Sequence, residues 1–137
     1  MEEKTITLIN QIAQLEVLAD AIESLSAEWE IPMSISLNLN LVLEELVTNI
    51  IFYGYEDADE HKILIHLSFT ANILHVRIED DAKEFNPLLQ SEPDVSAPIE
   101  TREIGGLGIH FVRKIMDDME YQRIDNTNVL KLRKKIT

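Results

Sequence analysis

The sequence has 137 residues, enough for one domain with its own hydrophobic core. Twelve Lys and Arg residues stand against 25 Asp and Glu, and the net charge of -13 makes nucleic acid a poor partner, because its phosphates would be repelled. The absence of cysteine excludes disulfides and thiolate metal sites. We find neither a secretion signal nor an apolar run long enough for a bilayer, so we expect a single cytoplasmic domain over residues 1–137 with no membrane partner.

The first half of the chain has the pattern of a strand followed by two helices. Residues 5–9 are typical of a short strand. Apolar side chains then recur at three- and four-residue steps over 12–25, which predicts an amphipathic helix that ends before Pro32. A second helix is expected from about Ser34, with Gly54 as its C-terminal stop.

The second half has the pattern of four strands and one more helix. Residues 63–69 and 74–78 alternate between apolar and polar, which predicts a hairpin with one buried face. Periodicity stops over 81–104, where three of the four prolines lie, so we expect a lid there. A helix over 109–116 and a closing pair of strands follow. This order predicts an α+β fold, a two-layer sandwich with a mixed, mostly antiparallel sheet and helices on one face.

Glu45 and Asn49 in the second helix are four residues apart and therefore share one face. A carboxylate beside an amide oxygen suits Mg²⁺ with its waters, or a base that takes a proton from an attacking hydroxyl. Glu44 points elsewhere. The alternative interpretation of the pair is a solvated polar face without a ligand.

Three of the four glycines lie in the turn Gly105-Gly106-Leu107-Gly108, which leads into the third helix. Glycine lets the backbone approach phosphate oxygens, and the N-H groups at a helix start favour an anion. The alternative is a lid hinge or helix start without a ligand. A dinucleotide-binding turn is disfavoured, because a third glycine in register and a preceding strand are missing.

Other polar residues carry weaker signals. Asp80 ends a strand, where its carboxylate could accept a hydrogen bond from an adenine amino group or simply be a charged terminus. The four histidines are interpreted as surface or cross-strand residues, because they lack metal-ligand spacing. The basic run over 131–135 is interpreted as a charged strand end that discourages edge pairing.

Taken in order, the segments 45–49, 80–87 and 105–109 resemble the three nucleotide-binding boxes of the GHKL ATPase superfamily, in particular its anti-sigma factor serine/threonine kinase branch. The similarity covers nearly the whole chain. It implies the Bergerat ATP-binding fold and a role as an ATP-binding anti-sigma regulatory factor. The implied reaction is phosphorylation of a serine or threonine on an anti-anti-sigma (STAS-type) protein in a partner-switching pathway. The resemblance also implies a possible sigma factor partner and a homodimer.

The resemblance assigns roles to individual residues. Glu45 is the expected general base, Asn49 the ligand of Mg²⁺, and Asp80 the acceptor for the adenine amino group. Backbone groups of Ala82 and of the glycine turn Gly105, Gly106, Leu107 and Gly108 complete the expected ATP site.

The sequence differs from the family at Ala82 and Glu84, where glycines are typical. A second function therefore stays open, a regulatory binding module without catalysis whose nucleotide pocket is vestigial or weak. A protein kinase and a binding module differ in whether phosphate leaves ATP.

Overall fold

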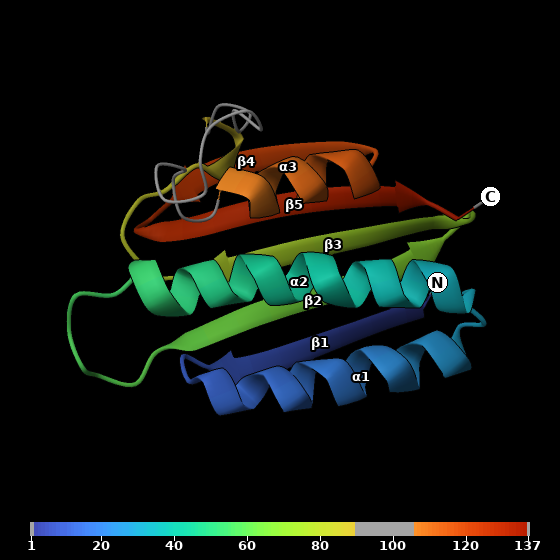
Figure 1. Ribbon diagram of the computed structural model, residues 1–137, viewed down its shortest axis with the longest axis horizontal. Helices are drawn as coiled ribbons and strands as arrows, with labels where there is room; N and C mark the ends of the chain where they lie inside the picture. The colour runs from blue at the N-terminus through green and yellow to red at the C-terminus, as the bar shows by residue number, and fades with distance from the viewer. Residues whose placement is uncertain (1, 90–105, 137) are drawn as a thin grey trace.

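The computed structural model describes residues 2–89 and 106–136 and shows an antiparallel sheet with helices on one face (Figure 1). The five strands have the order β1-β2-β3-β5-β4. They are β1 (Glu2–Ile9), β2 (Lys62–Thr70), β3 (Ile73–Asp80), β4 (Asp118–Ile124) and β5 (Thr127–Lys135). The predicted α+β sandwich is confirmed, and within the described residues every strand pair is antiparallel rather than mixed.

Three α-helices lie side by side over the sheet, with α2 between α1 and α3 (Figure 1). They are α1 (Leu15–Glu28), α2 (Met33–Tyr53) and α3 (Gly106–Ile115). The helix predicted to begin at Ile12 begins instead with a short 3₁₀ turn, η1 (Ile12–Gln14). The Gln14 side chain accepts a hydrogen bond from the Ile9 backbone N-H at 3.2 Å, which ties this turn to the end of β1.

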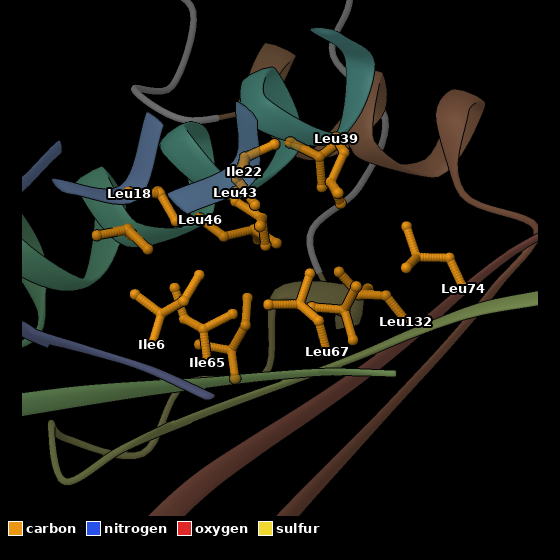
Figure 2. Packing of buried hydrophobic residues seen from close by; sticks show 14 of the residues in the cluster. Ile6, Leu18, Ile22, Leu39, Leu43, Leu46, Ile65, Leu67, Leu74 and Leu132 are labelled. Atoms are coloured by element: carbon orange, nitrogen blue, oxygen red, sulfur yellow. The ribbon is translucent and has the colours of Figure 1, made fainter. Parts of the chain in front are cut away.

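The core lies between the helices and the sheet, as Figure 2 shows for part of it. The helices contribute one apolar stripe each, because their buried residues recur at helical spacing. The strands contribute every second residue, because successive side chains point to opposite faces. Residues that meet in this layer include Leu18, Ile22, Leu43, Leu46, Ile65, Leu67 and Leu132.

Two tight hairpin turns set the pairing of the strands. Ala71 and Asn72 join β2 to β3, and Asp125 and Asn126 join β4 to β5. All four residues have positive φ, between 46° and 63°. Such backbone values at both central residues match the twist of the strands that a two-residue turn connects.

The basic C-terminal run is not at a sheet edge, so the interpretation of an edge-protecting strand end is wrong. β5 pairs with β3 on one side and with β4 on the other. The sequence alone does not reveal this position, because β4 precedes β5 in the chain whereas β5 lies between β3 and β4 in the sheet. Lys131 and Arg133 therefore lie on the open face of the sheet. Leu130 and Leu132, which alternate with them, are buried on the helix side.

From the sequence we expected no apolar run long enough for a bilayer, but by length and composition alone helix α2 meets that criterion, with a mean hydropathy of 1.4 in its most apolar window. It is the one helix of this kind in the described part of the chain. A core helix of a soluble protein meets the same criterion, and α2 buries Leu39, Leu43 and Val47 against the sheet.

Candidate nucleotide-binding site

A cavity of about 380 Å³ lies at one end of the sandwich, within the range of about 300–1,000 Å³ typical of ligand sites. The C-terminal end of α2 and the N-terminal end of α3 lie at this end of the molecule (Figure 1). The walls are mostly apolar, with polar groups at Asn49, Asp80, Lys83, Tyr121 and Asn128. The remaining lining residues are Leu46, Ile50, Tyr53, Gly54, Ile78, Ala82, Phe85, Pro87, Ile109 and Leu130.

Asp80 presents a buried carboxyl group to this cavity from the last position of β3. Its Oδ1 accepts hydrogen bonds from the Asn128 side-chain amide at 2.9 Å and from the Ala82 backbone N-H at 3.0 Å. Burial raises the pKa of Asp80, and these two hydrogen bonds oppose that shift. Among the described residues, the hydrogen bonds to this carboxylate all go to Oδ1, so Oδ2 can accept an amino group.

Asn128 of β5 is a buried residue that the sequence analysis missed. The strand register places it directly opposite Asp80. Its Nδ2 also donates to the Lys83 carbonyl at 2.9 Å, while its Oδ1 accepts from the Tyr121 hydroxyl at 2.5 Å and from the Phe85 N-H at 3.3 Å. The carboxamide thereby fixes both Asp80 and the chain that leaves β3. No local signal singles out Asn128, because β5 has polar or charged residues along most of its length.

We expect Asn128→Ala to lower ATP affinity about tenfold and to destabilise the fold by about 1–3 kcal/mol, because buried partners lose their hydrogen bonds. Calorimetry with ATP and chemical unfolding would measure both effects. In an Asp80→Asn background the same change should lose most of its effect on ATP affinity, because Asn128 acts through Asp80. Unchanged ATP affinity in Asn128→Ala would contradict this role.

Gly54 and Ala82 approach each other at the floor of the cavity. A Cβ built on Gly54 would lie 2.7 Å from the Ala82 Cβ and 2.6 Å from the Ile50 carbonyl oxygen, so no side chain fits there. The Lys83 N-H donates to the Gly54 carbonyl at 3.0 Å. The predicted helix stop at Gly54 is confirmed, and its requirement for glycine comes from this close approach.

Glu45 and Asn49 share one face of α2, as their spacing predicts. The Asn49 Nδ2 lies 3.4 Å from the Glu45 Oε1 in a long hydrogen bond. This contact leaves the Asn49 Oδ1 available as an oxygen ligand. Asn49 lines the cavity, whereas Glu45 stands one turn back along the helix. The exposed Glu44 is the neighbouring carboxylate on another face.

The glycine turn is only partly within the described residues. Gly105 lies outside them, while Gly106, Leu107 and Gly108 form the first turn of α3. Ile109 in the same helix lines the cavity, so this helix start borders it. Of the expected lid, residues 81–89 are described and end in the short turn η2 (Pro87–Leu89), and 90–104 lie outside. Lys83 lines the cavity and Glu84 is not among its lining residues.

His61 links the loop after α2 to the corner after β3. Its ring lies 2.8 Å from Asp57 and 3.1 Å from Asp81, and it stacks on Tyr55 at 4.2 Å between ring centroids. Hydrogen bonds to Asp57 and Asp81 raise the pKa of His61, and the hydrogen bond with His61 lowers the pKa of Asp57. Each of these two residues is the largest cause of the pKa shift of the other. In the described part of the chain, no group of three or more ligating side chains could hold a metal.

The antiparallel sheet, the helices on one of its faces and the cavity at the helix ends together define an α+β sandwich with a candidate ligand-binding cavity. The chain belongs to the histidine kinase-like ATPase domain family, which its residues 8–134 match. The suggested membership of this superfamily is confirmed, and the family implies the use of ATP.

Curated relatives place the chain with anti-sigma factors and serine-protein kinases. It is 24% identical over 98 residues to the anti-sigma F factor of Bacillus subtilis, covering 72% of this chain and 67% of that protein. It is 24% identical over 99 residues to the serine-protein kinase RsbW of Listeria monocytogenes serotype 4a, covering 68% and 62%. The matches therefore span about two thirds of the length of these relatives.

Solved structures support the fold. The crystal structure of the RsbU and RsbW domains of a Mycobacterium tuberculosis protein superposes with a TM-score of 0.71 at 12% identity, over 99% of this chain and 33% of that one. The histidine kinase domain of a blue-light activated kinase from Erythrobacter litoralis gives a TM-score of 0.57 at 15% identity, over 91% and 60%. At these identities the likeness concerns the fold alone.

Proposed function

We propose that this chain is an anti-sigma regulatory factor that binds ATP in the cavity and phosphorylates a serine or threonine of an anti-anti-sigma partner. The observation that carries the proposal is Asp80, because the hydrogen bonds it accepts from the described residues, two in number, both go to Oδ1. A buried carboxylate in an apolar pocket suits the adenine amino group, because the amino group donates and the carboxylate accepts. The same carboxylate disfavours guanine, whose corresponding oxygen is also an acceptor.

The other end of the cavity has groups that suit phosphates and their metal. Backbone N-H groups of Gly105, Gly106, Leu107 and Gly108 would contact the phosphates at the positive end of α3. Asn49 would hold Mg²⁺ through its Oδ1, which suits a metal that is otherwise bound by phosphates and water. Bound there, Mg²⁺ would neutralise phosphate charge. Lys83 would add a positive charge at the cavity wall.

The reaction would be an in-line phosphoryl transfer. Glu45 would accept the proton of the partner's hydroxyl as its oxygen bonds to the terminal phosphorus. The bond from that phosphorus to the bridging oxygen would break and ADP would leave. The contact with the Asn49 amide would keep the Glu45 carboxylate oriented along α2. The partner would be a STAS-type protein, with a sigma factor as a second partner of a cytoplasmic homodimer.

Two measurements test the proposal. Calorimetry with Mg-ATP should detect binding, and labelled phosphate should then move from ATP to a serine of a STAS-type acceptor from the same organism. No heat of binding up to millimolar ATP would contradict the nucleotide site. Binding without transfer would favour the alternative function, a regulatory module without catalysis. That alternative is motivated by the Ala82 methyl, which lies in the cavity wall.

A further inference from the structure

Charge is strongly segregated along this chain. From Thr5 to His61, a stretch that includes α1 and α2, the sequence has no Lys or Arg. The same stretch contains eleven carboxylates, at Glu16, Asp20, Glu23, Glu28, Glu30, Glu44, Glu45, Glu56, Asp57, Asp59 and Glu60. Cations lie instead on the opposite, open face of the sheet, including Arg77, Lys131 and Arg133. The helix layer on the α1 and α2 side is therefore acidic.

An apolar ridge crosses this acidic layer on the outward face of α2. Met33, Leu37 and Leu41 recur every four residues, and 78%, 60% and 49% of their surfaces are exposed. Phe52, 58% exposed, lies on the same outward side farther along α2, beyond the polar residues Glu44 and Thr48. From Met33 to Phe52 the ridge, with this polar interruption, spans about 28 Å at 1.5 Å per residue. Among the described elements, none crosses this face (Figure 1). Exposed apolar side chains that line up on one helix face are a mark of interaction sites.

Charged residues flank the ridge on the side of α1. Glu44 of α2 is exposed beside Leu37 and Leu41 at helical spacing. Glu16, Asp20 and Glu23 are exposed on α1, which packs next to α2. A partner that covers the ridge therefore meets carboxylates along one border. Lys and Arg at that border would be attracted, and Asp and Glu would be repelled.

We propose that the α2 ridge, defined as Met33, Leu37, Leu41 and Phe52, docks an amphipathic helix of a partner protein whose apolar stripe is bordered by Lys or Arg. A row of side chains at four-residue steps is the ridge that packs into the groove of another helix. A second copy of this chain is disfavoured, because it would bring a second acidic helix layer. An anionic lipid surface is disfavoured for the same reason. This inference is independent of the proposed phosphoryl transfer.

Fluorescence anisotropy with labelled helical peptides and the full chain tests the proposal. One peptide of about 20 residues has leucines at helical spacing and flanking lysines, and a second has glutamates in place of the lysines. The lysine peptide should bind, and the glutamate peptide should bind about tenfold more weakly or worse. Equal binding of both peptides would overturn the charge argument.

Variants locate the binding face. Leu37→Ser with Leu41→Ser should weaken the lysine peptide about tenfold or more, whereas the control Ile124→Ser, at an exposed site on β4, should leave binding unchanged. Thermal unfolding of each variant checks that it folds. Unchanged binding by the double variant would overturn the proposal. Two other results would also overturn the proposal. One is a wild-type dimer that dissociates in the double variant, as measured by sedimentation, and the other is binding to phosphatidylglycerol vesicles but not to the lysine peptide.

Discussion

Glu45→Gln should reduce phosphoryl transfer to the acceptor serine by about 10²- to 10⁴-fold while ATP affinity stays nearly the same. The amide of glutamine keeps the size and the hydrogen-bonding reach of the side chain but cannot take the hydroxyl proton. Asn49, at 3.4 Å from the Glu45 carboxylate, would still have an acceptor oxygen, so the metal and phosphate end should be preserved. Single-turnover transfer of labelled phosphate measures the chemical step separately from binding.

Glu44→Gln is the matched control, because Glu44 is adjacent in sequence but exposed on another face of α2. It makes the same change of charge without touching the Glu45 and Asn49 pair. Transfer should be unaffected. Equal rates in the wild type and in Glu45→Gln would remove Glu45 from the mechanism. Equal losses in both variants would point to the overall charge of the helix.

Asp80→Asn should weaken ATP binding by about 10- to 100-fold, since a hydrogen bond to a charged acceptor is replaced by an amide donor that faces the adenine amino group. The Oδ1 of the new asparagine can keep the hydrogen bonds from Asn128 and Ala82. Its Nδ2 then faces the cavity, which should shift preference from ATP toward GTP. Calorimetry with both nucleotides measures this change. Asp81→Asn, at the next residue, is the control and should leave nucleotide binding unchanged.

The same substitution should leave the melting temperature at neutral pH unchanged or raise it. Burial raises the pKa of Asp80, so the ionised carboxylate costs stability above its folded pKa. That cost disappears as pH falls and the group is protonated. In the wild type, this residue's contribution therefore becomes more favourable toward acid pH, and asparagine should remove that dependence. Thermal unfolding over about four pH units upward from about pH 4, the usual pKa of an aspartic acid, tests this sign. A lower melting temperature with ATP affinity retained would contradict the assignment of Asp80.

Much of the fold could be predicted because its signals are local. The buried stripe of α2 recurs at helical spacing, and the helix ends at Gly54 as expected. The alternation in β2 and β3 predicted their hairpin, which the pairing of Ile63 with Asp80 and Thr70 with Ile73 confirms. Periodicity within one segment depends on which face is buried, and this requires no knowledge of the neighbouring segments.

The features that the sequence did not predict depend on contacts between segments that are distant in sequence. Asn128 could not be assigned because it meets Asp80 only through the pairing of β5 with β3. The basic run was misjudged for the same reason, since a pattern does not show that β5 lies inside the sheet. The contact between Gly54 and Ala82 joins a helix end to a strand exit, and neither residue signals it alone. The roles of Glu45, Asn49 and the glycine turn remain predictions.

The two-residue turn between β4 and β5 determines how the start of β5, including Asn128, is placed. Asp125 and Asn126 fix which residue of β5 faces Asp80, because Ile124 must pair with Thr127 across the turn. A slip of one residue would exchange the two faces of β5 and turn Asn128 to the open side. The proposed adenine recognition by Asp80 should therefore be sensitive to the length of this surface turn. Because this hairpin has a single register, the turn determines which side chains of β5 face the pocket.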